Sequence, residues 1–62
     1  MFADERRADI VMLVNAQKTV TVSELTGRYR VSIETIRRDL ELLERDNLIR
    51  RVHGGAVSPG RM

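Results

Sequence analysis

The chain contains no cysteine, and this absence most constrains what its 62 residues can fold into. Chains of this length lie near the lower limit for a stable core without disulfides or a metal. With no thiol and a single histidine, neither a disulfide framework nor a structural zinc site is expected. Packing of side chains alone must hold the fold. Because Phe2 and Tyr29 are the only aromatic residues, that core must be mainly aliphatic.

Apolar residues recur at helical spacing in three parts of the chain. The first helix is predicted to begin at Asp4 as its N-cap and to end near residues 15–18, where Asn15 can take a left-handed cap. Its buried side would carry Ile10, Leu13 and Val14.

A second, shorter helix is predicted after Ser23 as its N-cap, with Leu25 and Tyr29 four residues apart on one side. The segment 30–32 then interrupts the helical pattern for three residues. Ser32, the last of them, is expected to cap the next helix.

The third helix is predicted over residues 33–46 and ends where Asn47 can adopt a left-handed conformation. Its apolar residues recur at steps of three and four along one face: Ile33, Ile36, Leu40 and Leu43. Two helices joined by a three-residue turn are the helix-turn-helix arrangement.

Three short segments have strand character. β-branched residues alternate over 19–22, and residues 48–52 and 56–57 flank a tight turn at His53-Gly54-Gly55. The predicted fold class is mainly α with a small β-hairpin, a three-helix winged helix-turn-helix. We expect the domain to cover residues 1–57 and a linker to begin at 58–62, which contains Ser-Pro-Gly.

Positive charge is concentrated in the second half of the chain. Residues 1–26 carry three cations against four acids, whereas residues 27–62 carry eight arginines against five acids. Arginine binds phosphates and guanine edges in a bidentate manner. A mild net charge of +2 is equally compatible with a nucleic-acid partner and with an ordinary soluble surface. The positions of the arginines must therefore distinguish these two interpretations.

The third helix is predicted to place two neighbouring arginines on different sides. With Ile33 set at zero and about 100° per residue, Thr35 and Arg38 lie at about 200° and 140°, opposite the apolar stripe. Arg37 lies at about 40°, at the border of that stripe. We therefore expect Thr35 and Arg38 to reach base edges, and Ser32 and Arg37 to contact phosphates.

An alternative interpretation is that these charges form ordinary intrahelical ion pairs. Glu34–Arg38 and Arg37–Glu41 both have the four-residue spacing that favours such pairs. Leu42 is an apolar residue on the predicted exposed face. Three interpretations remain open for it: the wing covers it, it contacts a partner, or it is simply exposed.

The predicted wing supplies a second basic surface. Arg51 is expected to contact phosphate, and His53 and Gly54 to contact DNA at the turn, where glycine lets the backbone approach closely. A plain hairpin turn and an exposed histidine are the simpler alternatives. No catalytic constellation is visible: there is no activated nucleophile, no carboxylate pair and no phosphate-cradling glycine loop. We expect no enzyme activity and no catalytic or metal site.

Four segments together resemble the amino-terminal domain of DeoR-type bacterial transcriptional regulators. They are Glu5-Arg6-Arg7, Val20-Thr21-Val22-Ser23-Glu24-Leu25, Thr35-Ile36-Arg37-Arg38-Asp39-Leu40 and Arg51-Val52-His53-Gly54-Gly55-Ala56. The resemblance covers residues 5–57 and implies a winged helix-turn-helix that binds double-stranded operator DNA. Regulators of this type usually repress genes of sugar or nucleoside catabolism.

The resemblance also implies features outside this chain. Such regulators continue into a carboxy-terminal domain that binds a phosphorylated sugar and forms homo-oligomers, so no cofactor is expected in this chain itself. Three positions depart from the glycines common in the family: Lys18, Arg30 and Asn47. Gly27, inside the second predicted helix, is a further departure.

The setting of the chain is expected to be cytoplasmic, without a membrane partner. Its longest uninterrupted apolar run is Ile10 to Val14, far shorter than a membrane span. The apolar stripes suffice for one small core, so a monomer is expected in isolation. The remaining alternative is a winged-helix module that binds protein instead of DNA, whose binding would depend little on salt.

Overall fold

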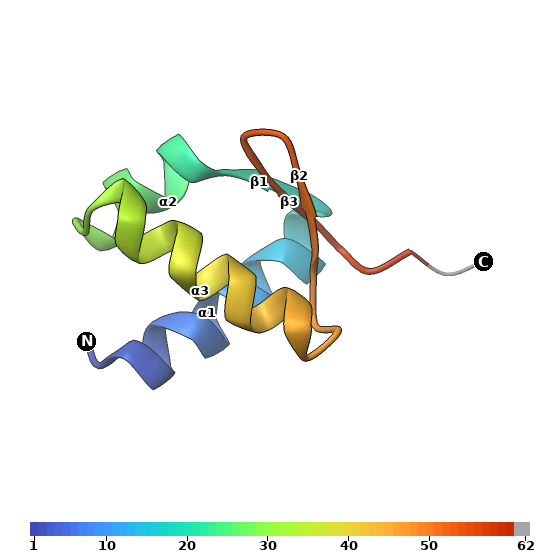
Figure 1. The fold of residues 1–62 in the computed structure, drawn as a ribbon, viewed down its shortest axis with the longest axis horizontal. Helices are drawn as coiled ribbons and strands as arrows, with labels where there is room; N and C mark the ends of the chain where they lie inside the picture. The colour runs from blue at the N-terminus through green and yellow to red at the C-terminus, as the bar shows by residue number, and fades with distance from the viewer. Residues whose placement is uncertain (61–62) are drawn as a thin grey trace.

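Three helices and three short strands follow one another along the chain, and their arrangement confirms the predicted winged helix-turn-helix (Figure 1). The computed structural model describes residues 1–60, so positions 61 and 62 of the predicted linker lie outside the described residues. The elements are α1 (Ala3–Gln17), β1 (Thr19–Thr21), α2 (Val22–Tyr29), α3 (Ile33–Arg45), β2 (Arg50–Val52) and β3 (Gly55–Val57).

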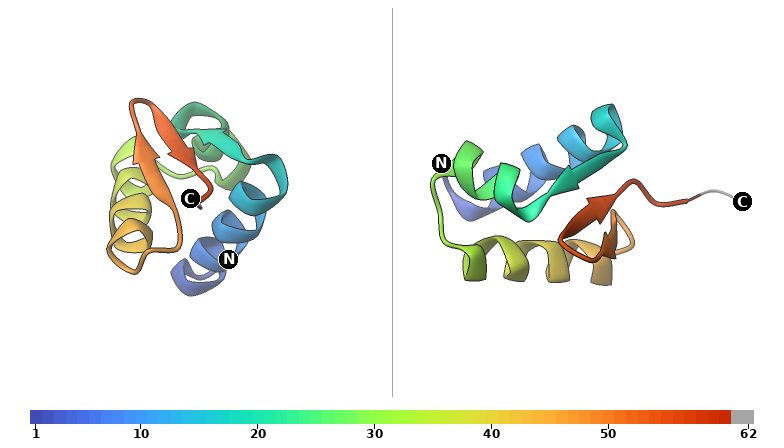
Figure 2. Two further views of the ribbon diagram at one scale, coloured as in Figure 1. Left: turned by 90° about the vertical axis from the view of Figure 1, so that its right-hand side faces the viewer. Right: turned by 90° about the horizontal axis from the view of Figure 1, so that it is seen from above.

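The strands form one antiparallel sheet in the order β1-β3-β2. The predicted hairpin is thus present as β2 and β3, and Ala56 at its centre pairs with both Val20 and Arg51. Figure 2 shows this hairpin between α3 on one side and β1 on the other. The added strand β1 ties the hairpin to the body of the domain.

Helix α1 begins earlier than predicted, because Asp4 does not serve as its N-cap. Phe2 occupies the cap position, and its backbone N–H donates to Glu5 Oε1 at 2.9 Å. The Asp4 carboxylate instead pairs with Arg7 at 3.0 Å. Asp4 and Glu5 thus remain in the first turn, where negative charge is favourable. The cap, however, is made by Glu5, whose side chain accepts from the backbone N–H of the N-cap residue.

Helix α2 also begins earlier than predicted, at Val22, and Ser23 lies within its first turn. Thr21 and Glu24 form a reciprocal capping box, in which each side chain accepts from the other residue's backbone N–H at 3.0 Å. This arrangement satisfies two backbone donors at once. It also ends β1 at Thr21, one residue before the predicted limit.

Left-handed backbone follows all three helices, at Lys18 (φ 74°), Arg30 (φ 55°) and Asn47 (φ 62°). The prediction for Asn47 is confirmed, whereas the end of α1 uses Lys18 and not Asn15. These are the three positions at which the resemblance to DeoR-type regulators leads one to expect glycine. The chain thus keeps the left-handed backbone at each position, although this conformation is less favourable for lysine, arginine and asparagine than for glycine.

The second half of the chain contains small differences in boundaries. Helix α3 ends at Arg45, one residue before the predicted limit, because Asp46 already leaves helical geometry. Strand β2 begins at Arg50 and not at residue 48, since Leu48 bonds back to the Leu43 carbonyl at 3.0 Å and closes the helix end. Strand β3 includes Gly55, which the prediction assigned to the turn.

The core is aliphatic, as the composition predicts. Its buried apolar side chains are Ile10, Val14, Val20, Leu25, Ile36, Leu40, Leu43, Ile49 and Ala56. Every helix and each of β1 and β3 contributes at least one of them. Ile33, which the periodicity placed on the apolar stripe, is 48% exposed because it lies at the first position of α3, beyond the end of the core.

Candidate nucleic-acid interface

The start of α3 is organised by two hydroxyl side chains. Ser32 is the N-cap, as predicted: its Oγ accepts from the Thr35 backbone N–H at 3.1 Å and donates to Thr35 Oγ1 at 3.0 Å. Ser32 is exposed and Thr35 is half-buried. Both predicted contact residues therefore lie at the amino-terminal end of α3, where Ser32 donates a hydrogen bond to the Thr35 hydroxyl.

Three of the predicted site residues line a single exposed hollow between α3 and the wing, which we define as residues 50–57. They are Arg37 and Arg38 from α3 and Arg51 from β2. Glu34 and Glu41, on the same helix, line it as well. Three cations thus converge with two acids on one open surface, which suits an anionic partner that approaches from solvent.

Arg37 and Arg38 differ in their position relative to the wing. Arg37 also lines a second, smaller hollow with Arg51 and Gly54, whereas Arg38 does not. The helical-wheel prediction placed Arg37 at the edge of the apolar stripe, and Leu40 of the core does line this second hollow. Arg37 therefore lines both hollows beside the wing, whereas Arg38 lines only the larger one, which it shares with Arg51.

The predicted intrahelical ion pairs are not formed. Within residues 1–60, the side chains paired within 4.0 Å are Arg6–Asp39, Arg7–Asp4, Arg7–Asp39 and Arg28–Asp9. Neither Glu34–Arg38 nor Arg37–Glu41 is among them, so that alternative interpretation is wrong. In this part of the chain the guanidinium groups of the hollow have no carboxylate partner.

The wing is held against α3 by a side chain that the sequence reasoning did not single out for this role. Glu44 Oε2 accepts from the Arg51 backbone N–H at 3.0 Å. Since this bond uses the backbone, the Arg51 side chain remains exposed and lines the hollow. Leu42, the apolar residue predicted on the exposed face, is half-buried beside Glu44 and Arg51.

The two glycines of the wing have separate roles. Gly54 has a positive φ of 78° in the two-residue turn between β2 and β3, a conformation that favours glycine. Gly55 is buried, and a Cβ added there would overlap the carbonyl oxygen of Val20 in β1. His53 is exposed beside Gly54 in the turn and lines neither hollow described above.

The residue that sequence reasoning missed most clearly is Asp39, which is buried at 1% exposure. It receives hydrogen bonds from Arg6 Nε at 2.5 Å, from the second Arg6 nitrogen at 3.0 Å and from Arg7 at 3.3 Å. The hydrogen bond to Asp39 raises the pKa of the Arg6 guanidinium above its ordinary value. The available signal was its position at about 240° on the helical wheel, next to the apolar stripe.

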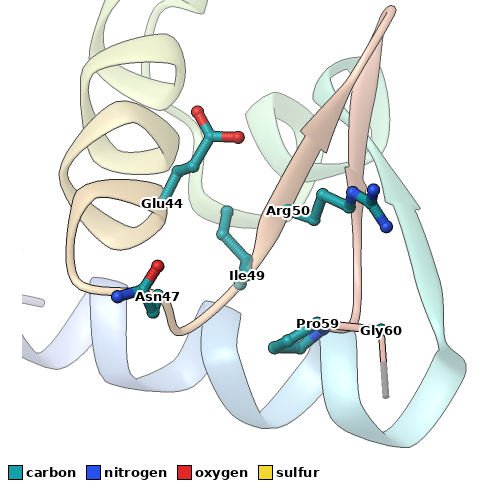
Figure 3. A pocket seen from close by; sticks show the side chains of 6 residues that line it. All are labelled: Glu44, Asn47, Ile49, Arg50, Pro59 and Gly60. Carbon is teal, nitrogen blue, oxygen red and sulfur yellow. The ribbon is translucent and has the colours of Figure 1, made fainter. Parts of the chain in front are cut away.

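A further hollow lies at the other end of α3, where the chain leaves the sheet (Figure 3). Glu44 at the end of α3 and Asn47 just after it contribute to this hollow, and the segment after β3 contributes Pro59 and Gly60. The predicted DNA-contact residues line none of it. Among residues 1–60 there is also no cluster of potential metal ligands and no helix long and apolar enough to cross a membrane.

The comparisons with known proteins agree with this geometry. A family model described as the DeoR-like helix-turn-helix domain matches residues 6–61. The chain is 50% identical over 58 residues to YulB of Bacillus subtilis, described as an uncharacterized HTH-type transcriptional regulator, and this match covers 94% of the chain and 22% of that protein. It is 47% identical over 55 residues to the glycerol-3-phosphate regulon repressor of Escherichia coli, which covers 89% of the chain and 22% of that protein.

A third relative is the lactose phosphotransferase system repressor of Streptococcus mutans, 43% identical over 58 residues that cover 94% of the chain and 23% of that protein. The chain thus spans less than a quarter of the length of each of these three relatives. No solved structure is significantly similar to it. With the family model matched over nearly the whole chain and the wing and recognition helix in place, the chain belongs to the family of DeoR-like helix-turn-helix domains.

Proposed function

We propose that this chain is the sequence-specific DNA-binding domain of a bacterial transcriptional repressor, with α3 in the major groove and the wing alongside it. The observation that carries the proposal is the exposed hollow in which Arg37, Arg38 and Arg51 converge without a carboxylate partner among residues 1–60. The amino-terminal turns of a recognition helix are the part that reaches base edges in this architecture.

The residues have separate roles in this proposal. Arg38 reads a guanine edge, since it is exposed on α3 and lines only the larger, open hollow. Arg37 and Arg51 bind phosphates on the side of the wing, and His53 and Gly54 contact DNA at its turn. Thr35 contacts a base through its own hydroxyl proton, which is not used in the bond that it accepts from Ser32. Ser32 contacts a phosphate by turning its hydroxyl proton from Thr35 to the phosphate, while its Oγ still accepts from the Thr35 backbone N–H.

The regulated genes and the effector are inferred from the relatives. Two of them are named as repressors of glycerol-3-phosphate and lactose phosphotransferase functions. We therefore assign the chain to a cytoplasmic repressor of a sugar catabolism operon, in which a further carboxy-terminal domain binds a phosphorylated sugar and forms homo-oligomers. In this arrangement residues 1–57 are the DNA-binding domain, residues 58–62 begin the linker, and the chain alone is a monomer without enzyme activity.

The direct test is selection from a pool of randomised duplex DNA. The wild-type chain is expected to enrich a short common sequence, and a triple variant with alanine at positions 37, 38 and 51 is expected to enrich none. The variant keeps every core residue, so circular dichroism should show an unchanged helical content. Failure of the wild-type chain to retain DNA at low salt would favour a protein-binding module and contradict the proposal.

A further inference from the structure

An ionic cluster centred on a buried carboxylate joins the amino-terminal half of α1 to the middle of α3. Asp39 accepts from two nitrogens of Arg6 and from one of Arg7, and Arg7 also pairs with Asp4. Asp39 is 1% exposed and is the one charged residue buried to this degree in the described chain. We call these four residues the Asp39 cluster.

The Asp39 cluster is a poor explanation for stability. A buried ion pair loses hydration on folding, and apolar residues of similar volume often stabilise a protein equally well or better. The side chains around Asp39 already include a continuous aliphatic core, to which Ile36 and Leu40 on the same helix belong. An apolar residue at position 39 would simply widen the apolar stripe of α3.

The Asp39 cluster instead fixes the rotation of α3 about its own axis. Contacts between aliphatic side chains depend little on orientation, so a helix packed only through Ile36, Leu40 and Leu43 retains some freedom to roll about its axis. A guanidinium that bridges both oxygens of one carboxylate fixes distance and angle together. Arg6 makes this bridging contact with Asp39, at 2.5 and 3.0 Å.

We infer that Asp39 is a positioning residue, which through Arg6 and Arg7 fixes the roll of α3 so that Arg38 faces the bases and Arg37 the phosphates. Arg38 precedes Asp39 directly, so its direction around the helix is set relative to Asp39 by about 100°. The same contacts assign Arg6 and Arg7 to α3 and not to DNA. This inference rests on the proposed function, but the orientation of α3 is measurable without DNA.

The test replaces the ionic contact with an apolar one, in a chain that carries both Arg6→Met and Asp39→Leu. Arg7 keeps Asp4 as a partner in this variant. The matched control is Tyr29→Phe, which removes a partly buried hydrogen bond between α2 and α1, donated by Tyr29 to Asp9, and does not involve α3. The melting temperature of the double variant is expected to equal or exceed that of the wild-type chain.

Two measurements on this variant decide the question. In DNA-free protein, residual dipolar couplings of α3 amides should depart from the wild-type orientation relative to α1, while those of α2 should not. On DNA, the ratio of affinities for the selected duplex and a random duplex should fall about fivefold or more, while affinity for the random duplex changes less than twofold. The control should leave both measurements unchanged.

A second variant covers the case in which the double variant does not fold. Arg6→Lys keeps the charge but cannot bridge both carboxylate oxygens, and it should shift the α3 couplings in the same direction by a smaller amount. Wild-type α3 couplings in a folded variant would overturn the inference even if the chain bound no DNA. A shifted α3 in a chain that selects no DNA sequence would instead support the positioning role and contradict the proposed function.

Discussion

Two glycines of the chain differ in what surrounds their α-carbons. Gly27 lies inside α2, where an added Cβ would meet no atom within 4 Å. Gly55 lies against β1, where the same atom would overlap the Val20 carbonyl. We therefore expect Gly27→Ala to stabilise the domain by about 0.5–1 kcal/mol, because glycine in a helix interior is entropically unfavourable.

Gly55→Ala is expected to destabilise it by about 2–3 kcal/mol, since β1 or β3 must move to admit the methyl group. Urea denaturation of both variants measures this contrast. Equal effects of the two substitutions would show that the close approach of β1 to β3 is not what position 55 requires.

The two neighbouring arginines of α3, Arg37 and Arg38, give a second prediction at this scale. Arg38→Ala should cost about 1–3 kcal/mol on the selected duplex and relax the preference at one base position. Arg37→Ala should weaken binding to selected and random duplexes nearly equally, because a phosphate contact carries no sequence information. Titrations of both variants on both duplexes distinguish the roles, and the reverse pattern would refute the assignment.

At this scale the sequence was informative where the position of a residue on its own helix decides its location, as for the Ser32 cap and for Arg37 and Arg38 on the exposed side of α3. It was not informative for Asp39, because its partners Arg6 and Arg7 are more than thirty residues away. Periodicity marks the border of an apolar stripe, but it does not identify which distant side chain meets a residue there.

The ends of the helices show how local signals compete. Alternative caps lie within two residues of each other, and Thr21 prevails over Ser23 because Glu24 completes a capping box with it. The hairpin was predictable from the turn sequence, but the pairing of β1 with β3 was not. That pairing joins residues 19–21 to residues 55–57 and is set by tertiary packing.

The left-handed residues after the helices provide a prediction for single elements. Lys18 has φ 74°, is exposed and closes α1 through a backbone bond to the Val14 carbonyl at 2.7 Å. Lys18→Gly should raise the free energy of unfolding by up to about 1 kcal/mol, because a non-glycine residue in this conformation is strained. Thermal denaturation measures it, with Lys18→Ala as the control for loss of the side chain; destabilisation by glycine relative to alanine would contradict this account.

The contact between α1 and α2 predicts a pH dependence. Tyr29 OH donates a hydrogen bond to Asp9 at 2.6 Å. Burial is the main cause that raises the pKa of Tyr29, and this hydrogen bond is the second. The folded protein thus favours the neutral phenol. The contribution of the neutral Tyr29 phenol to stability is complete below about pH 10, its ordinary pKa in the unfolded chain. This contribution is lost as the pH rises through the higher pKa of the folded state.

Tyr29→Phe should therefore be less stable than the wild-type chain at pH 8, by about 1 kcal/mol. The difference should shrink above pH 10. Denaturant titrations of both proteins from pH 8 to 11 test this, and a difference that does not change with pH would exclude the phenol as its source.

At the scale of the whole molecule, the arginines of the helices and strands within residues 1–60 fall into two groups. Those of α1 and α2 pair with carboxylates: Arg6 and Arg7 with Asp39, and Arg28 with Asp9. Those of α3 and β2 have no carboxylate within 4.0 Å among residues 1–60; they are Arg37, Arg38, Arg45, Arg50 and Arg51. The modest net charge thus conceals an uneven distribution, in which the unpaired arginines gather on α3 and the wing, next to Glu34 and Glu41.

The salt dependence of binding to a random duplex tests this central claim most directly. Four to six neutralised phosphates should give a slope of log affinity against log salt of about −4 to −5. Removing Arg37, Arg38 and Arg51 together should make the slope shallower by about two, because Arg37 and Arg51 are the two of these residues assigned to phosphates. A flat dependence for the wild-type chain, or an unchanged slope in the triple variant, would contradict the assignment of DNA binding to the face formed by α3 and the wing.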